Sequence, residues 1–178
     1  MKVTEVHERM VRSVWLENEL KLNKNIEELS EYDVQDDMFL AFDASLKNTG
    51  AYPRRERAGK VDCVLYEGDS PKVFYEIKTY FKENEQVLKK HFDDDLQKLA
   101  SRLKRHSGTR GFFFIAGTKR KIRDLEPQQL RFVQEHLGRQ HRRWVDYPAT
   151  TGGDPIRLRP SKMERQGRSV VMTWEVMI

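Results

Sequence analysis

The chain of 178 residues contains a single cysteine, Cys63, and so lacks most cysteine-based chemistry. One cysteine cannot form an internal disulfide, and no Cys/His spacing typical of a metal site is present. Because Cys63 lies among strand-forming residues, we expect a small core side chain in a reducing compartment rather than a reactive thiol.

Long apolar runs are also absent. No stretch approaches the roughly 20 apolar residues of a membrane span, and the first residues, MKVTEVHERM, contain no signal-peptide core. We therefore expect an intracellular, cytoplasmic protein with no membrane partner. With no internal repeat or low-complexity segment to divide the chain, we expect one domain over residues 1–178.

What the chain does contain is a core-forming composition and an excess of positive charge. Hydrophobic residues make up 38% of the sequence, with nine Phe, three Trp and six Tyr, which is enough for a folded domain. The net charge of +5 fits a polyanionic partner such as nucleic acid. An ordinary soluble surface with a slight Lys and Arg excess explains the same charge, so both interpretations stay open.

The order of apolar patterns and turn residues predicts a mixed α/β domain. Residues 110–117 are almost wholly apolar, which indicates a strand covered on both faces. We expect a core over about residues 4–147 and a C-terminal strand extension over 148–178. The segments Lys24–Asp37 and 47–60 are expected to be loops, the first with a helix end. Helices are predicted over 4–22, 84–105 and 125–138, and strands over 38–46, 60–67, 72–81, 110–117, 142–148 and 169–178.

A predicted hairpin, Lys60–Phe81, carries three polar residues that are costly to bury: Asp62, Glu76 and Lys78. Glu76 and Lys78 are two residues apart, so on a strand they share one face. Carboxylate and carbonyl oxygens suit Mg²⁺, which makes Asp62, Glu76 and the backbone carbonyl of Ile77 candidate ligands. A lysine beside such an ion supplies charge to a phosphate or orients a water molecule.

Asp62, thirteen further residues and then Glu76-Ile77-Lys78 resemble the motif of the PD-(D/E)XK nuclease superfamily, over about Thr4–Gly117. The resemblance implies a restriction-endonuclease-like fold, with a mixed central sheet flanked by helices on both faces. It implies Asp62 and Glu76 as metal ligands and Lys78 as the catalytic lysine. The proline that names the motif is missing, since Val61 precedes Asp62.

The same resemblance implies further site residues on the helices before and after the hairpin. From the first helix the candidate is Glu8, with Glu17 next. From the second it is Lys98 or Gln97. In contrast, we interpret Asp93-Asp94-Asp95 as surface and capping charge, because adjacent helical residues splay around the axis.

Two basic segments are candidates for nucleic-acid contact. Each is also explained by solvation, as a loop or a helix terminus, and the residues do not decide between the two. The candidates are Arg54, Arg55 and Arg57 in one segment, and Arg139, Arg142 and Arg143 in the other.

The predicted function is a metal-dependent nuclease that hydrolyses phosphodiester bonds, in DNA more than in RNA. The cofactor is Mg²⁺, with Mn²⁺ as a substitute. The alternative is a nucleic-acid-binding module of the same fold that is non-catalytic or depends on a partner. A homodimer or a partner subunit, with Tyr147–Ile178 as an interface, also stays open.

Overall fold

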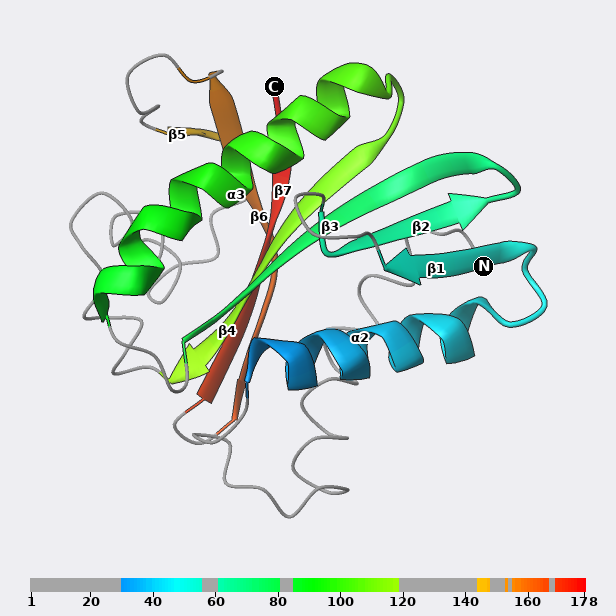
Figure 1. Ribbon diagram of the computed structural model, residues 1–178, viewed down its shortest axis with the longest axis horizontal. Coiled ribbons are helices and arrows are strands. Elements are labelled where there is room, and N and C mark those ends of the chain that lie inside the picture. Colours follow the sequence, from blue (N-terminus) through cyan, green and yellow to red (C-terminus); the bar gives the residue numbers. More distant parts are fainter. Residues whose placement is uncertain are drawn as a thin grey trace.

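The computed structural model describes residues 30–55, 61–80, 85–118, 144–147, 153, 155–166 and 169–178 (Figure 1). Within them lie helices α2 (Glu31–Leu46) and α3 (Glu85–Arg105). The strands are β1 (Ala51–Arg55), β2 (Cys63–Glu67), β3 (Ser70–Tyr80), β4 (Arg110–Thr118), β5 (Val145–Tyr147), β6 (Ile156–Gln166) and β7 (Ser169–Met177). The helices predicted over 4–22 and 125–138 lie outside the described residues.

The strands form one seven-stranded sheet in the order β1-β2-β3-β4-β7-β6-β5. The β3–β4 pair is parallel and the other neighbouring pairs are antiparallel. The mixed α/β class predicted from the sequence is thus confirmed. No helix in the described part of the chain is both long and apolar enough to cross a membrane.

The predicted hairpin is confirmed as β2 and β3, which meet at a turn where Gly68 has a φ of 57°. A positive φ of this kind favours glycine. The strands differ in length: β2 begins at Cys63, opposite Tyr75, whereas β3 continues to Tyr80. The last residues of β3 therefore have β4 on one edge but no β2 partner on the other.

The strand predicted over Met38–Leu46 is wrong, as is the expectation of a loop in the residues before it. Helix α2 covers both stretches from Glu31 onward. Its buried residues are Val34, Met38, Ala41, Phe42 and Leu46, and this spacing of three to four residues is helical. The run of five apolar residues at 38–42 hid that period, because neighbours on the exposed face, such as Leu40, are apolar too.

Two further strands were not predicted. The segment 47–60, expected to be a loop, contains β1, which pairs with β2 at the edge of the sheet. An edge strand tolerates Pro53 because one side of it needs no hydrogen-bond donor. Strand β6 pairs with β7 along most of its length, although its sequence is mainly polar. The helix predicted over 84–105 and the strands predicted at β4, β5 and β7 are confirmed.

Two hydrophobic cores alternate along β4. Phe112, Phe114 and Ala116 belong to the core that includes the buried face of α2. Phe113 and Ile115 belong to the core that includes α3, together with Trp174. Successive strand residues face opposite sides of a sheet, so the cores lie on opposite sides of β4. In Figure 1, α3 crosses the upper part of the sheet, whereas α2 runs below β1 and β2.

Candidate active site

The candidate site lies where β3 extends past the start of β2. Asp62 directly precedes β2, and its Oδ2 accepts a hydrogen bond of 2.7 Å from the backbone N–H of Ile77. That N–H lies beyond the last β2–β3 pair, Cys63 with Tyr75, so the carboxylate replaces the missing strand partner. The local chain geometry therefore places Asp62 beside the Glu76-Ile77-Lys78 segment.

Glu76 and Lys78 share the face of β3 that is packed by α3, as Phe74 in the α3 core indicates. Helix α3 adds Asp95 and Lys98 to them. The Lys78 ammonium lies 2.7 Å from Asp95 Oδ2, and the Lys98 ammonium lies 3.1 Å from Asp95 Oδ1. Lys98 also pairs with Glu76 Oε1. The structure thus joins four charged groups from β3 and α3 in one chain of ion pairs.

The first turn of α2 supplies a fifth charged group, Glu31. Ser30 caps this helix: its side chain accepts from the N–H of Asp33, while Asp33 Oδ2 accepts from the N–H of Ser30 at 2.8 Å. This reciprocal cap holds the turn in which Glu31 Oε2 lies 3.5 Å from the Lys78 ammonium.

The pKa values of two carboxylates in the site, Glu76 and Asp62, are raised. Burial raises the pKa of Glu76 to about 9, and repulsion from Asp62 adds to the rise, although Lys98 opposes it. Burial also raises the pKa of Asp62 to about 6, with repulsion from Glu31 and Asp95; the Ile77 N–H acts the other way. Both shifts mean that burial and mutual repulsion disfavour the ionised forms of the two carboxylates, although Lys98 lies beside Glu76.

The remaining groups are stabilised in their charged forms. Burial would lower the pKa of Lys78, but its ion pairs with Glu31 and Asp95 outweigh burial and raise it. The pKa of Lys98 is likewise raised by Glu76 and Asp95 against the effect of burial. For Asp95, burial alone would raise the pKa, yet the two lysines lower it. Asp95 is therefore an anion that forms ion pairs with both lysines.

A divalent cation fits the Asp62–Glu76 pair. Glu76 Oε2 is buried and has no hydrogen-bond partner, so one carboxylate oxygen is left to bind a cation. The described residues contain no group of three His, Cys, Asp or Glu side chains spaced to hold a metal. Mg²⁺ is commonly held by one or two carboxylates, with water and substrate oxygens as further ligands, so two carboxylates are enough.

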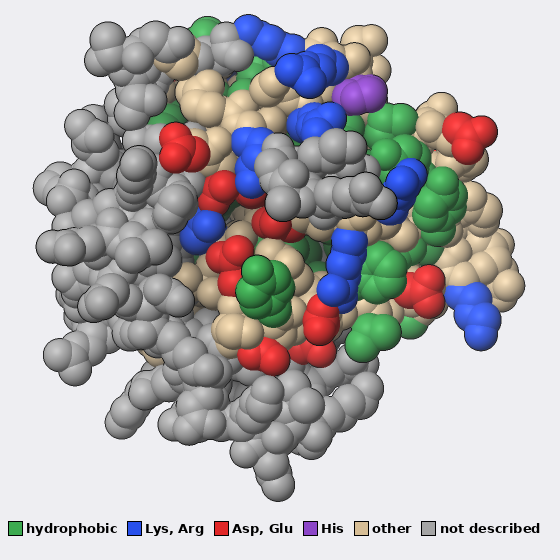
Figure 2. All heavy atoms as spheres, in the orientation of Figure 1, with side chains coloured by type: hydrophobic (Ala, Val, Ile, Leu, Met, Phe, Trp, Pro, Cys, Tyr) green, Lys and Arg blue, Asp and Glu red, His purple; other side chains and the backbone are tan. Residues whose placement is uncertain are grey.

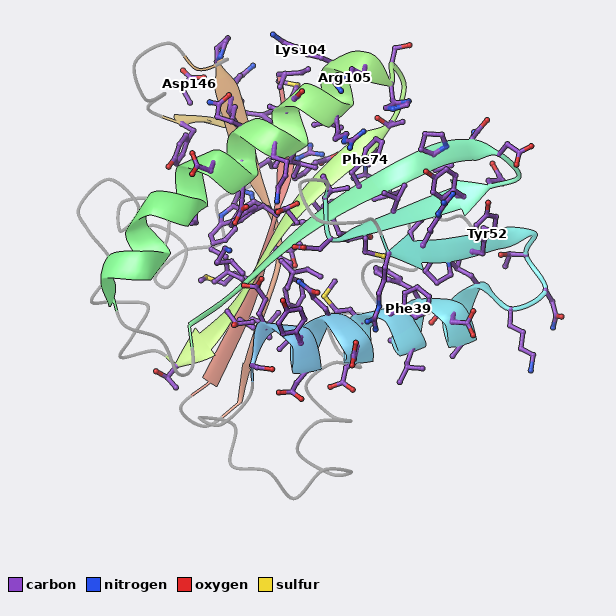
Figure 3. All side chains as sticks on the ribbon, in the orientation of Figure 1. Phe39, Tyr52, Phe74, Lys104, Arg105 and Asp146 are labelled. Carbon is purple, nitrogen blue, oxygen red and sulfur yellow. The ribbon has the colours of Figure 1, made fainter. Side chains whose placement is uncertain are left out.

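The structure brings together Asp62, Glu76, Lys78 and Lys98 among the predicted site residues. Gln97 instead lies against Gly153, where an added Cβ would collide with its amide group. Arg54 and Arg55 lie exposed on β1, and Arg55 pairs with Asp36 and covers the Phe39 ring at 5.0 Å. Figure 3 shows Phe39 on α2, facing β1. Outside the described residues are Glu8, Glu17, Arg57, Arg139, Arg142 and Arg143.

The interpretation of Asp95 as surface charge is wrong. Its residue is 8% exposed, whereas the neighbouring Asp94 is exposed. The signal was its spacing: Asp95 follows Phe92 by three residues and precedes Leu99 by four, on the buried stripe of α3. Glu31 was also missed, because the helix that carries it was not predicted.

Basic side chains gather at the C-terminal end of α3, the helix that also carries Asp95 and Lys98. Its last turn contains Arg102, Lys104 and Arg105. Figure 3 shows Lys104 and Arg105 at this end of the helix, and Figure 2 shows blue side chains clustered over the same region. Red acidic side chains lie nearer the centre of that face. A negative centre is thus bordered by positive charge.

The chain matches no known family model, no curated protein and no solved structure.

Proposed function

We propose that the protein is a metal-dependent nuclease of the restriction-endonuclease-like type, with Mg²⁺ as cofactor and DNA, rather than RNA, as the favoured substrate. Asp62 and Glu76 hold the ion, with the carbonyl of Ile77 as a further ligand. The full fold, with helices on both faces of the sheet, is part of this proposal.

One observation carries the proposal: the buried Glu76 carboxylate, which is paired with Lys98 on one oxygen and has no partner on the other, lies next to the partly buried Asp62 carboxylate, whose charge raises the pKa of Glu76. A purely structural pair of acids at this position would be costly, because burying like charges together destabilises the folded protein. A divalent cation removes that cost. Carboxylates that are only partly compensated in this way are typical of functional sites.

The chain's own residues divide the work of hydrolysis. When bound, Mg²⁺ supplies charge to the phosphate and activates a water molecule. Asp62 orients Ile77 through its hydrogen bond, which aligns the Glu76-Ile77-Lys78 segment. Lys78, held by Asp95, contributes a fixed positive charge that stabilises the transition state. The basic end of α3 attracts the phosphate backbone.

The decisive experiment is a cleavage assay with linear, circular and single-stranded DNA and with RNA, in Mg²⁺ or Mn²⁺. The site variants are Asp62→Asn, Glu76→Gln and Lys78→Met; the asparagine keeps an acceptor for the Ile77 N–H. Each is expected to lose at least about 100-fold in rate, as is usual when transition-state stabilisation is removed. Mapping the product ends separates endonuclease from exonuclease action.

Matched controls come from the other end of the same hairpin, where Lys72 and Glu67 form an exposed ion pair at 3.6 Å. Lys72→Met and Glu67→Gln remove the same chemical groups and should cleave like the wild type. Equal cleavage by site and control variants would contradict the proposal. A wild type that binds DNA without cleaving it would favour the alternative, a nucleic-acid-binding module. The lysines and acids of the site form ion pairs with one another, and such pairs can also stabilise a protein that is not catalytic.

A further inference from the structure

Asp95 binds both lysines of the site, one on each carboxylate oxygen, at 2.7 Å to Lys78 and 3.1 Å to Lys98. The lysines differ in their second partner. The Lys78 ammonium lies 3.5 Å from Glu31 Oε2, whereas the Lys98 ammonium pairs with Glu76 Oε1. Lys98 therefore contacts one of the two carboxylates assigned above to the metal, and Lys78 contacts neither.

Exposure separates the two lysines as well. The Lys98 side chain is 27% exposed, against 11% for Lys78 and 2% for Glu76. Lys98 sits one helical turn after Asp95, so this contact is local to α3 and survives the loss of Glu76 as a partner. A lysine ammonium is a point charge on a flexible stem, which makes such a partial release inexpensive.

We propose that Lys98 is a resident counter-cation that a divalent metal ion displaces from Glu76, so that the two cations compete for one carboxylate. Before metal arrives, Lys98 offsets part of the buried charge of Glu76. After the exchange it stays tethered to Asp95, as a positive charge beside the occupied site. This inference rests on the proposed function for the identity of the metal ligands.

Competition and simple charge repulsion predict different results for the two lysines. If Lys98 only repels the metal through its charge, removing either lysine should raise metal affinity to a similar degree. If Lys98 occupies Glu76, removing Lys98 should act far more strongly than removing Lys78. Lys78→Met is therefore the matched control for Lys98→Met, because each removes one ammonium bound to Asp95.

The test is calorimetric titration of the full chain with Mn²⁺, without nucleic acid. Lys98→Met is expected to bind Mn²⁺ about tenfold more tightly than the wild type, the equivalent of one charged hydrogen bond. Lys78→Met should change Kd by at most about threefold, since Lys78 contacts neither carboxylate of the metal and is paired with Glu31 and Asp95 instead. Glu76→Gln should weaken binding.

Thermal unfolding with and without Mn²⁺ gives a second readout, in which Lys98→Met should show a larger metal-induced rise in Tm than the wild type or Lys78→Met.

Lys98→Gln guards against a folding defect in the methionine variant, because it removes the charge but keeps a donor for Glu76. Equal Kd shifts for the Lys98 and Lys78 variants, or weaker binding by both Lys98 variants, would overturn the competition and leave the proposed function standing. No Mn²⁺ binding by the wild type, or binding unchanged in Glu76→Gln, would overturn both the inference and the metal site.

Discussion

At the scale of single residues, the negative charge of Asp95 is compensated by Lys78 and Lys98. Its side chain is 12% exposed and lies between two ammonium groups. Removing one partner of a buried ion pair leaves uncompensated charge, which is far more costly than losing a pair exposed to solvent. Asp95 therefore contributes to the stability of the protein as well as to the alignment of Lys78.

We predict that Asp95→Asn lowers the free energy of unfolding by about 3 kcal/mol, as expected when a buried pair is broken. Asp94→Asn is the control, because Asp94 is exposed and should change stability by less than about 0.5 kcal/mol. Urea unfolding followed by circular dichroism measures both values. Equal stability of the two variants would show that Asp95 is not held as an ion pair in solution.

The contrast between Asp94 and Asp95 explains how far the site could be predicted from sequence. Asp62, Glu76 and Lys78 were found because strand periodicity and the acid-x-lysine pattern are local features. Asp95 and Glu31 reach the site through the packing of α3 and α2 on the sheet, which depends on contacts distant in sequence. Only the position of Asp95 on an apolar stripe hinted at burial. The roles of these residues stay predictions.

At the scale of the elements, α2 links the stability of a helix end to the site. Its capping box fixes the first turn, and the same turn carries Glu31 to Lys78. Loss of an N-cap side chain exposes backbone N–H groups that have no partner within the helix. The position of Glu31 therefore depends on Ser30, whose hydrogen bonds in the described part of the chain go to Asp33.

We expect Ser30→Ala to lower the free energy of unfolding by about 1 kcal/mol, the usual cost of losing an N-cap. Ser45→Ala, near the other end of α2, serves as the control. Alanine is the better helix former there, so stability should stay the same or rise slightly. Guanidinium unfolding checks the pair. A loss as large for Ser45→Ala as for Ser30→Ala would remove the cap as the cause.

Element prediction succeeded where one feature dominated the sequence and failed where two features competed. The turn residues at 68–71 and the β-branched and aromatic residues on both sides of them identified the hairpin. In α2, the consecutive apolar run at 38–42 outweighed the helical spacing that begins at Val34, and the polar residues from Lys24 onward favoured a loop. Strand β6 has mainly polar residues, and its pairing with β7 was the missing information. Pairing between distant strands is not readable from local composition.

At the scale of the whole molecule, β4 joins the two hydrophobic cores. Phe113 packs against Phe92 of α3 at a ring distance of 4.9 Å, and the next residue, Phe114, faces the α2 core. Both side chains are fully buried. Since one strand contributes side chains to both cores, we expect the loss of one core to disturb the packing of the other. The described elements should therefore unfold together.

We predict that Phe113→Ala and Phe114→Ala each lower the free energy of unfolding by about 3–5 kcal/mol, the cost of a large cavity in a core. In both variants, unfolding followed by circular dichroism and by tryptophan fluorescence should give one coincident transition. The fluorescence of Trp174 reports on the α3 core, whereas the helical signal in circular dichroism comes from both α2 and α3. Leu40→Ala is the control, since Leu40 is 62% exposed on α2 and should cost less than about 0.5 kcal/mol. Separate transitions in Phe114→Ala would mean that the α2 core unfolds independently and that β4 does not couple the two sides of the sheet.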